Sequence, residues 1–403
     1  MSAASSRVRR VAGAIDPALG VLAFIGFISQ VGISVMLPLL PLYATELGAT
    51  PFVLGLLTSS FAVTNAIGQL GTGFLVDRWG SRRFISGGLG LYATMNALIA
   101  TAVSAPWLLA WRSLAGFGGG TMLIAERIYL AEVAQPSRRA FANGVISAAQ
   151  SAGSVAGPAV GGLAATFAGL RAPFILVALT SAIALVGTFF LPSPAARTAV
   201  EPEPASGGQR ADGEPLPYAA LGALLVANLA LMASYGAFIT TYAPFATSAL
   251  RWSTLDVGIA FSFLGAGSIL LGPGLAHLAD RFSRRAVAVV APVPIAAFAL
   301  GMVAALPHPV ILALAFVAGG GLTAFNAAWY ALLADLAGER RRGRIFGVMS
   351  AISNGGIVVG ALLAAELWSR TDVVAGLLVA VATLAIAGVA MLAFRPRSLP
   401  LAS

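Results

Sequence analysis

The stretch GFLVDRWGSRR, from Gly73 to Arg83, returns 203 residues later as AHLADRFSRR, from Ala276 to Arg285, and each copy lies between two long apolar segments. Several other residues recur at the same offset without any shift. They include Gly116 and Gly319, Gly153 and Gly356, and Gly157 and Gly360. Repetition at one fixed period indicates a duplicated structural unit. The sequence therefore predicts two homologous halves, an arrangement found in many secondary transporters.

The composition places these halves in a membrane. Of the 403 residues 58% are hydrophobic and only 10% are charged, whereas soluble domains carry about 25% charged residues. Cysteine is absent and the two histidines, His277 and His308, lie far apart. We therefore expect no thiol catalysis, no metal site and no cofactor, and an intramembrane enzyme is disfavoured because no nucleophile and base are paired inside the spans.

The distribution of the basic residues indicates membrane topology rather than nucleic-acid binding. All 24 are arginines, and 19 of them fall at the termini, in the central linker and in alternate loops. Only Arg171, Arg251 and Arg370 fall in the loops on the opposite side. This asymmetry follows the positive-inside rule and predicts that both termini are cytoplasmic. The first apolar run is about 25 residues long, so it is expected to span the membrane rather than act as a cleaved signal.

Apolar segments of spanning length occur twelve times. Six precede residue 192, at 18–43, 52–76, 84–104, 107–131, 140–167 and 173–191, and six follow residue 217, at 218–246, 254–279, 286–306, 309–335, 343–368 and 373–394. Each reaches the ~20 residues that a helix needs to cross the hydrocarbon core. The predicted fold is an all-α membrane protein with twelve transmembrane helices in two pseudo-symmetric six-helix bundles.

The halves are expected to be residues 1–191 and 218–403. Between them, residues 192–217 are rich in proline, glycine and acidic side chains, which is typical of a flexible linker. The other loops are short, so no room is left for an extramembrane catalytic domain.

The repeated loop resembles the signature between helices 2 and 3 of the major facilitator superfamily, and the resemblance covers essentially the whole chain. Its matching residues are Gly73, Asp77, Arg78, Gly80, Arg82 and Arg83, with a weaker copy at Asp280 and Arg281. In that family the aspartate faces the N-terminus of helix 11 and latches one face of the transporter, so a gating role is implied here. The alternative is that these arginines only fix topology.

The fourth segment carries Leu108, Arg112 and Gly116, followed by Gly118 to Gly120. This pattern resembles a second signature, found in proton-coupled members of the family. An arginine inside a span is costly unless it faces a partner or a wet cavity. The alternative for Arg112 is that its side chain extends to the nearby interface.

Farther along this segment lie Glu126 and Arg127. Glu126 is 14 residues past Arg112, which places the two within about 40° of the same helix face. It is the carboxylate that falls clearly inside a span, so Glu126, Arg112 and Arg127 are the candidates for proton coupling. The alternative is a structural ion pair near the headgroups.

The fifth segment contains a glycine and proline motif formed by Gly153, Gly157, Pro158, Gly161 and Gly162. It resembles the antiporter signature of the same family, and its partial copy at Gly356 and Gly360 lacks the proline. Glycines four residues apart let another helix approach closely, and proline kinks the helix. Generic packing of small residues is the alternative to an antiporter role.

The 203-residue offset relates the face of Glu126 to the tenth segment. A substrate cavity is predicted from five polar side chains: Gln30, Tyr235, Asn326, Tyr330 and Asn354. Apolar walls with sparse polar groups suit broad binding of small molecules. Each residue has the alternative role of a hydrogen bond between helices.

Together these features predict a proton-coupled antiporter that exports lipophilic small molecules or drugs. Export of a native metabolite such as a sugar, amino acid or lysolipid, and facilitated diffusion, are the alternatives. The expected partners are protons and a small-molecule substrate, with no nucleic acid, and a monomer is expected. The predicted location is a bacterial cytoplasmic membrane, because arginine-only usage with abundant alanine and glycine suggests a GC-rich bacterial genome.

Overall fold

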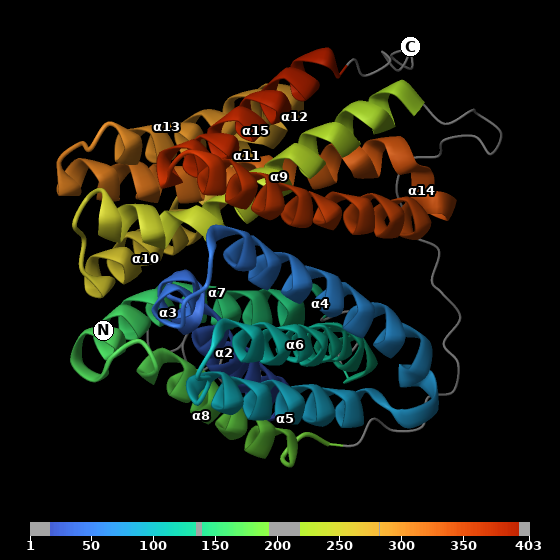
Figure 1. Ribbon diagram of the computed structural model, residues 1–403. Coiled ribbons are helices and arrows are strands. Elements are labelled where there is room, and N and C mark those ends of the chain that lie inside the picture. Colours follow the sequence, from blue (N-terminus) through green and yellow to red (C-terminus); the bar gives the residue numbers. More distant parts are fainter. Residues whose placement is uncertain (1–16, 134–138, 193–217, 282, 395–403) are drawn as a thin grey trace, which may run out of the picture. The chain divides into compact units, whose positions relative to one another are not determined.

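A computed structural model describes residues 17–133, 139–192, 218–281 and 283–394, which are almost entirely helical (Figure 1). Before residue 192 the helices are α2 (Pro17–Met36), α3 (Leu40–Glu46), α4 (Pro51–Trp79), α5 (Ser81–Ala100), α6 (Ala105–Val133), α7 (Arg139–Ala168) and α8 (Ala172–Thr188). After residue 217 they are α9 (Tyr218–Ser248), α10 (Thr254–Leu270), α11 (Gly272–Arg281), α12 (Arg284–Val290), α13 (Pro292–Val303), α14 (His308–Arg370) and α15 (Val373–Ala393). The predicted linker at 192–217 lies outside the described residues except for Pro192.

Among the described residues seven helical segments are both long and apolar enough to span a membrane, and Ala172–Thr188 and Thr254–Leu270 are shorter apolar helices. The all-helical, two-repeat prediction is confirmed, while the number twelve stays a prediction. Three predicted spans are interrupted. The first breaks between α2 and α3 around Pro38, and the ninth breaks before Pro292, because proline cannot donate the hydrogen bond that would continue the helix. The eighth breaks at Leu271.

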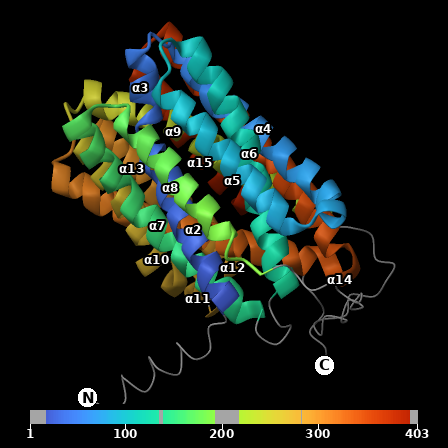
Figure 2. The ribbon, with the colours of Figure 1, turned by 90° about the horizontal axis from the view of Figure 1, so that it is seen from below.

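The described chain forms two compact units. The first comprises Met1–Leu39 and Val63–Val200, and the second comprises Leu40–Ala62 and Glu201–Ser403. In the first unit α2 packs on α7 and α8, and α5 packs on α6 and α8; Figure 2 shows α5 beside α6. Leu22, Ile25, Ile85, Leu89 and Tyr129 are fully or almost fully buried at the centre of this packing.

In the second unit α14 reverses direction. The rings of Tyr330 and Phe346 stack with their centroids 6.0 Å apart, whereas 16 residues of straight helix would separate them by about 24 Å. The two arms of α14 therefore correspond to the predicted segments 309–335 and 343–368. Both arms lie against α9 (Figure 1), since Trp329 Nε1 donates to Leu224 O at 2.8 Å and Gly360 packs against Ala233.

The segment Leu40–Ala62 belongs to the second unit, although the predicted halves place it in the first. Thr58 Oγ1 lies 3.2 Å from Thr240 Oγ1 on α9, and the Ser59 hydroxyl donates to Val358 O at 3.4 Å. A β-carbon on Gly55 would lie 2.7 Å from the β-carbon of Ala365. Small side chains thus let this segment pack closely on α9 and α14, and the compact units differ here from the sequence halves.

Candidate functional site

Helix α6 carries two buried charged side chains. Arg112 is 3% exposed and Glu126 is 5% exposed, and the 14 residues between them correspond to about 21 Å along the helix axis. They therefore occupy two different depths in the first unit and cannot contact one another directly. Arg127, next to Glu126, lies on the exposed side of the helix.

Arg112 is enclosed by side chains of α2 and α5. Its Nη1 lies 3.5 Å from Met36 Sδ on α2, and the hydroxyl of Tyr92 on α5 lies beside the guanidinium. Asn96, one turn further along α5, donates from Nδ2 to Tyr92 O at 2.7 Å. The guanidinium is thus buried among side chains of α2 and α5, and the part of Arg112 in proton coupling stays a prediction.

Glu126 meets a partner that the sequence analysis missed. Gln150 Nε2 on α7 donates to Glu126 Oε2 at 3.4 Å, while Oε1 is buried and has no hydrogen-bonding partner among the described residues. Gly26 on α2 faces Gln150, since a β-carbon at Gly26 would lie 3.3 Å from Gln150 Cγ. The carboxyl group thus has one oxygen positioned by an amide and the other available for a proton. The sequence signal for Gln150 is a polar residue one turn before Gly153.

The remaining polar candidates in the first unit lie on α2 and α4. Gln30 Nε2 donates to Ser34 Oγ at 3.2 Å on α2. On α4, Gln69 Nε2 donates to Asn65 Oδ1 at 2.7 Å, and Asn65 Nδ2 donates to Gly116 O at 3.3 Å. The sequence analysis did not single out Asn65 and Gln69, although an i,i+4 polar pair inside an apolar span is a usable signal.

The antiporter-like motif packs α7 onto α2. A β-carbon at Gly153 or Gly157 would lie 2.7 Å from Phe27 O or Val31 O, and one at Gly161 would overlap Val35 O. Gly162 is also buried, and Pro158 lies inside α7. Close helix packing therefore accounts for three of the glycines. The antiporter role stays a prediction.

The repeated loop motif has a structural role in both units. Arg82 donates from Nε to Thr188 O at 3.1 Å and from Nη2 to Phe189 O at 3.0 Å, which caps the C-terminal end of α8. Arg285 donates from Nε to Met391 O at 3.4 Å and from Nη2 to Leu392 O at 2.5 Å, which caps α15. These pairs obey the 203-residue offset, so the repeat extends to individual hydrogen bonds.

A second pair of contacts in this motif differs between the units. Ser81 Oγ donates to Glu132 Oε2 at 2.5 Å, whereas Arg284 Nη1 pairs with Asp335 Oδ2 at 2.7 Å.

The turn before α5 depends on Gly80, which has a φ of 83°, a left-handed conformation that favours glycine.

The other members of the predicted gating motif lie near the ends of α4, α5 and α11. Gly73, Asp77, Arg78, Arg83 and Arg281 are exposed, and the side chain of Asp280 lies outside the described part of the chain. A gating role for them stays a prediction.

The predicted cavity residues of the second unit lie on α9 and on both arms of α14. Tyr235 and Asn326 are half-buried, and Asn354 is exposed. Tyr330 is 49% exposed, and its ring stacks on that of Phe346. The position that corresponds to Glu126 by the offset is Trp329, which is buried and donates to Leu224 O. The buried carboxyl is therefore a feature of the first unit.

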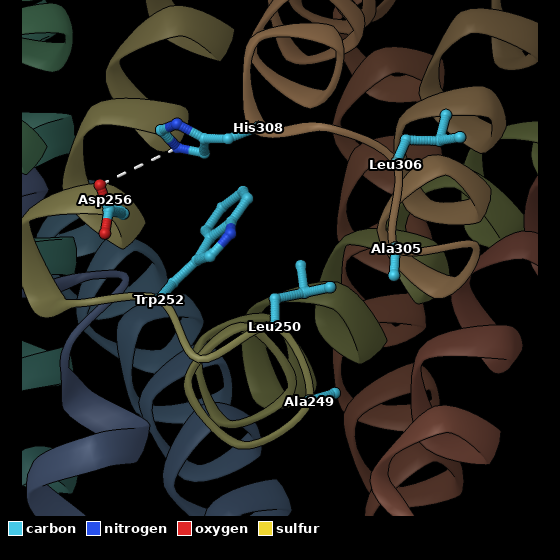
Figure 3. Close-up of a pocket in the computed structure, with 7 residues that line it drawn as sticks. All are labelled: Ala249, Leu250, Trp252, Asp256, Ala305, Leu306 and His308. Atoms are coloured by element: carbon cyan, nitrogen blue, oxygen red, sulfur yellow. Dashed lines mark ion pairs between the residues drawn. The ribbon is translucent and has the colours of Figure 1, made fainter.

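A separate pocket of about 460 Å³ opens in the second unit between the ends of α9, α10, α13 and α14 (Figure 3). His308 Nε2 lies 3.9 Å from Asp256 Oδ1, and the Trp252 ring meets the imidazole edge-on. Asp256 Oδ2 also accepts from the backbone and hydroxyl of Ser253 and caps α10. The sequence analysis missed this pairing, because the two residues are 52 positions apart and no local pattern connects them.

Duplicated helical units with charged groups buried in long apolar helices define a membrane transport protein of the secondary type. The chain belongs to the Major Facilitator Superfamily, which residues 22–243 and 224–403 match.

Curated relatives and solved structures agree with this assignment. The chain is 28% identical over 165 residues to Multidrug resistance protein 2 of Bacillus subtilis (strain 168), covering 41% of each chain. It is 26% identical over 245 residues to the Quinolone resistance protein NorA of Staphylococcus aureus (strain MSSA476), covering 60% of this chain and 62% of the relative. The matches thus span about two fifths and three fifths of these relatives.

Two solved structures share the fold over nearly the whole chain. The crystal structure of the nucleoside transporter NupG matches with a TM-score of 0.78 at 15% identity, covering 94% of this chain and 100% of that one. A bacterial homologue of the human lysosomal transporter Spinster matches with a TM-score of 0.74 at 16% identity, covering 94% and 96%. At these identities the likeness shows the fold alone.

Proposed function

We propose that this chain is a proton-coupled antiporter that exports lipophilic small molecules across a bacterial cytoplasmic membrane. The observation that carries the proposal is Glu126, a carboxyl group buried inside an apolar helix with one oxygen hydrogen-bonded by Gln150 and the other without a partner among the described residues. Carboxyl groups held inside membrane helices are typical of proton pathways. The drug and quinolone resistance proteins among its relatives support export of drug-like cargo.

In this proposal Glu126 alternately binds a proton and releases it as the transporter changes the side to which it opens. Gln150 holds one carboxyl oxygen, so the group keeps its orientation when its charge changes. Arg112, about 21 Å away along α6, supplies a fixed positive charge at another depth rather than an ion-pair partner. Arg127 lies on the exposed side and affects Glu126 only through its charge. Both termini are cytoplasmic and the transporter acts as a monomer.

The glycine and proline motif on α7 supports the antiporter class by resemblance. The proposed contacts for cargo are the polar groups of Gln30, Tyr235, Asn326, Tyr330 and Asn354. None of these five side chains is charged, which favours lipophilic cargo over strongly ionic molecules. Asp77, Arg78 and the repeated Asp280 and Arg281 are proposed to act in gating.

Inside-out vesicles that contain the protein and a respiration-generated pH gradient test this function. The gradient is followed with a quenched acridine dye while lipophilic cations, neutral antibiotics, sugars and amino acids are added one at a time. We expect dequenching by lipophilic compounds and none in Asp77→Asn vesicles. Dequenching by sugars or amino acids alone would indicate a metabolite exporter. Downhill flux of cargo without any proton movement would indicate a facilitator.

A further inference from the structure

A cavity of about 370 Å³ lies in the first unit at the turn between α4 and α5, and Glu126 is not among the residues that line it. It is lined by Trp79, Arg83, Phe84, Gly87, Gly88 and Thr121. Its walls are mainly apolar. Because it begins where α4 ends and α5 starts, we expect its mouth to lie at the level where a spanning helix meets the membrane surface.

The mouth of the cavity carries the positive charge of Arg83, for which the described residues offer no partner. Arg83 is exposed, and no hydrogen bond or ion pair joins it to another described residue. Its neighbour Arg82, in contrast, donates hydrogen bonds to two carbonyl oxygens at the end of α8. Trp79 and Phe84 stack beside the mouth with ring centroids 5.9 Å apart. Tryptophan at this level is typical of the headgroup region of a bilayer.

The floor of the cavity carries an unsatisfied polar group. Thr121 on α6 is 7% exposed, and its Oγ1 has no hydrogen-bonding partner among the described residues. Gly88 brings α5 against α6, since its β-carbon would lie 2.7 Å from Met122 N. A β-carbon on Gly87 would meet nothing within 4 Å, so the space beside it is open. The cavity therefore extends at least one helical turn, about 6 Å, inward from Arg83.

We propose that this cavity binds an anionic phospholipid, with the phosphate on Arg83 and the start of an acyl chain beside Gly87. The arrangement matches an amphiphile that is anionic at one end and apolar along its body, with one oxygen that can accept a hydrogen bond from Thr121. Basic pockets between transmembrane helices at the cytoplasmic surface are suited to such headgroups. The loop that contains Arg83 is one of those predicted to be cytoplasmic. The proposal depends on membrane insertion and not on proton coupling or on any particular cargo.

Native mass spectrometry of the full chain in detergent tests the proposal by comparing phosphatidylglycerol with phosphatidylcholine of identical acyl chains. We expect one phosphatidylglycerol to be retained more strongly than phosphatidylcholine. Arg83→Gln should weaken its binding about fivefold, while Arg171→Gln, which removes an exposed arginine elsewhere in the same unit, should not. Equal retention of the two lipids, or an equal effect of both substitutions, would overturn the proposal.

Two further variants separate the cavity from general surface attraction. Gly87→Leu fills the open space and should abolish the selective binding, whereas Gly144→Leu, at another glycine with no neighbour within 4 Å, should leave it intact. Thr121→Val, which keeps the shape and removes the hydroxyl, should weaken binding in a chain that elutes and melts like the parent. Retention of phosphatidylglycerol by Gly87→Leu would contradict an acyl chain in this cavity. Competition by glycerol phosphate as strong as by the whole lipid would show a free-phosphate site instead.

Discussion

At the scale of single residues, the environment of Glu126 depends on two neighbours from other helices. Gln150 supplies an amide donor from α7, and Gly26 on α2 leaves the space in which the Gln150 side chain lies. A buried charge costs more free energy than a buried neutral group unless it is paired and hydrogen-bonded, and only one oxygen of this carboxyl has a hydrogen-bonding partner among the described residues. The local geometry therefore suits a group that changes its protonation state during transport.

Replacing Gln150 by leucine is expected to slow proton-coupled transport about tenfold, because a hydrogen bond to a charged group contributes about 1.5–3 kcal/mol. The rate of cargo-induced dequenching at fixed pH gradient measures this effect. Gln69→Leu is the matched control, since Gln69 bonds Asn65 rather than a carboxyl group. Equal losses in the two variants would show that Gln150 has only a packing role.

At the scale of elements, the internal repeat is preserved in hydrogen bonds as well as in sequence. Arg82 caps α8 and Arg285 caps α15 through two carbonyl oxygens each. The last four carbonyl groups of a helix have no partner inside the helix, and a cation near them is also favoured by the helix dipole. The arginine at position 82 of the loop motif, and its copy at position 285, therefore each bind the end of the last helix in their own unit.

Arg82→Ala and Arg285→Ala should each destabilise the protein by about 1–3 kcal/mol, because each removes charged hydrogen bonds to a helix end. Since the two arginines lie in separate units, the effects should add in the double variant. Thermal unfolding in detergent provides the comparison. Lysine at either position should recover only part of the loss, because it lacks the planar fork that reaches two carbonyl groups. A neutral outcome for either alanine variant would contradict the capping role.

The α2–α7 contact makes a separate prediction about glycine. Gly157→Ala should lower the unfolding temperature, because the new methyl group would lie 2.7 Å from Val31 O. Gly144→Ala, on the same helix but with open space around it, should be neutral or stabilise by about 0.5–1 kcal/mol. If both variants unfold at the same temperature, α7 does not pack on α2 as described.

At the scale of the whole molecule, the sequence was sufficient for the fold because the repeat and the apolar segments are global signals. The superfamily and the all-helical fold follow from them. The packing of Leu40–Ala62 with the second unit could not be predicted in this way. It depends on Gly55 meeting Ala365 and on Thr58 meeting Thr240, contacts between residues about 180 to 310 positions apart.

The same limit applies to the candidate site. Glu126 was identifiable because a carboxylate inside an apolar span is conspicuous, whereas Gln150 is an ordinary polar residue until the helices are packed. The contact between Asp256 and His308 likewise joins the first turns of α10 and α14, which share no sequence pattern. The hydrogen bonds of Arg82 to the end of α8 and of Ser81 to the end of α6 could not be predicted, because they depend on how these helices pack.

The central claim is that export is driven by protons through Glu126, and uphill transport in reconstituted proteoliposomes tests it most directly. With an imposed pH gradient, the chain should accumulate a lipophilic cargo identified in the vesicle panel against its own gradient. Glu126→Gln should abolish this accumulation while still exchanging labelled cargo at equilibrium, and Glu366→Gln, at a carboxylate paired with Arg370, should behave like the parent. Undiminished uphill accumulation by Glu126→Gln would contradict the account.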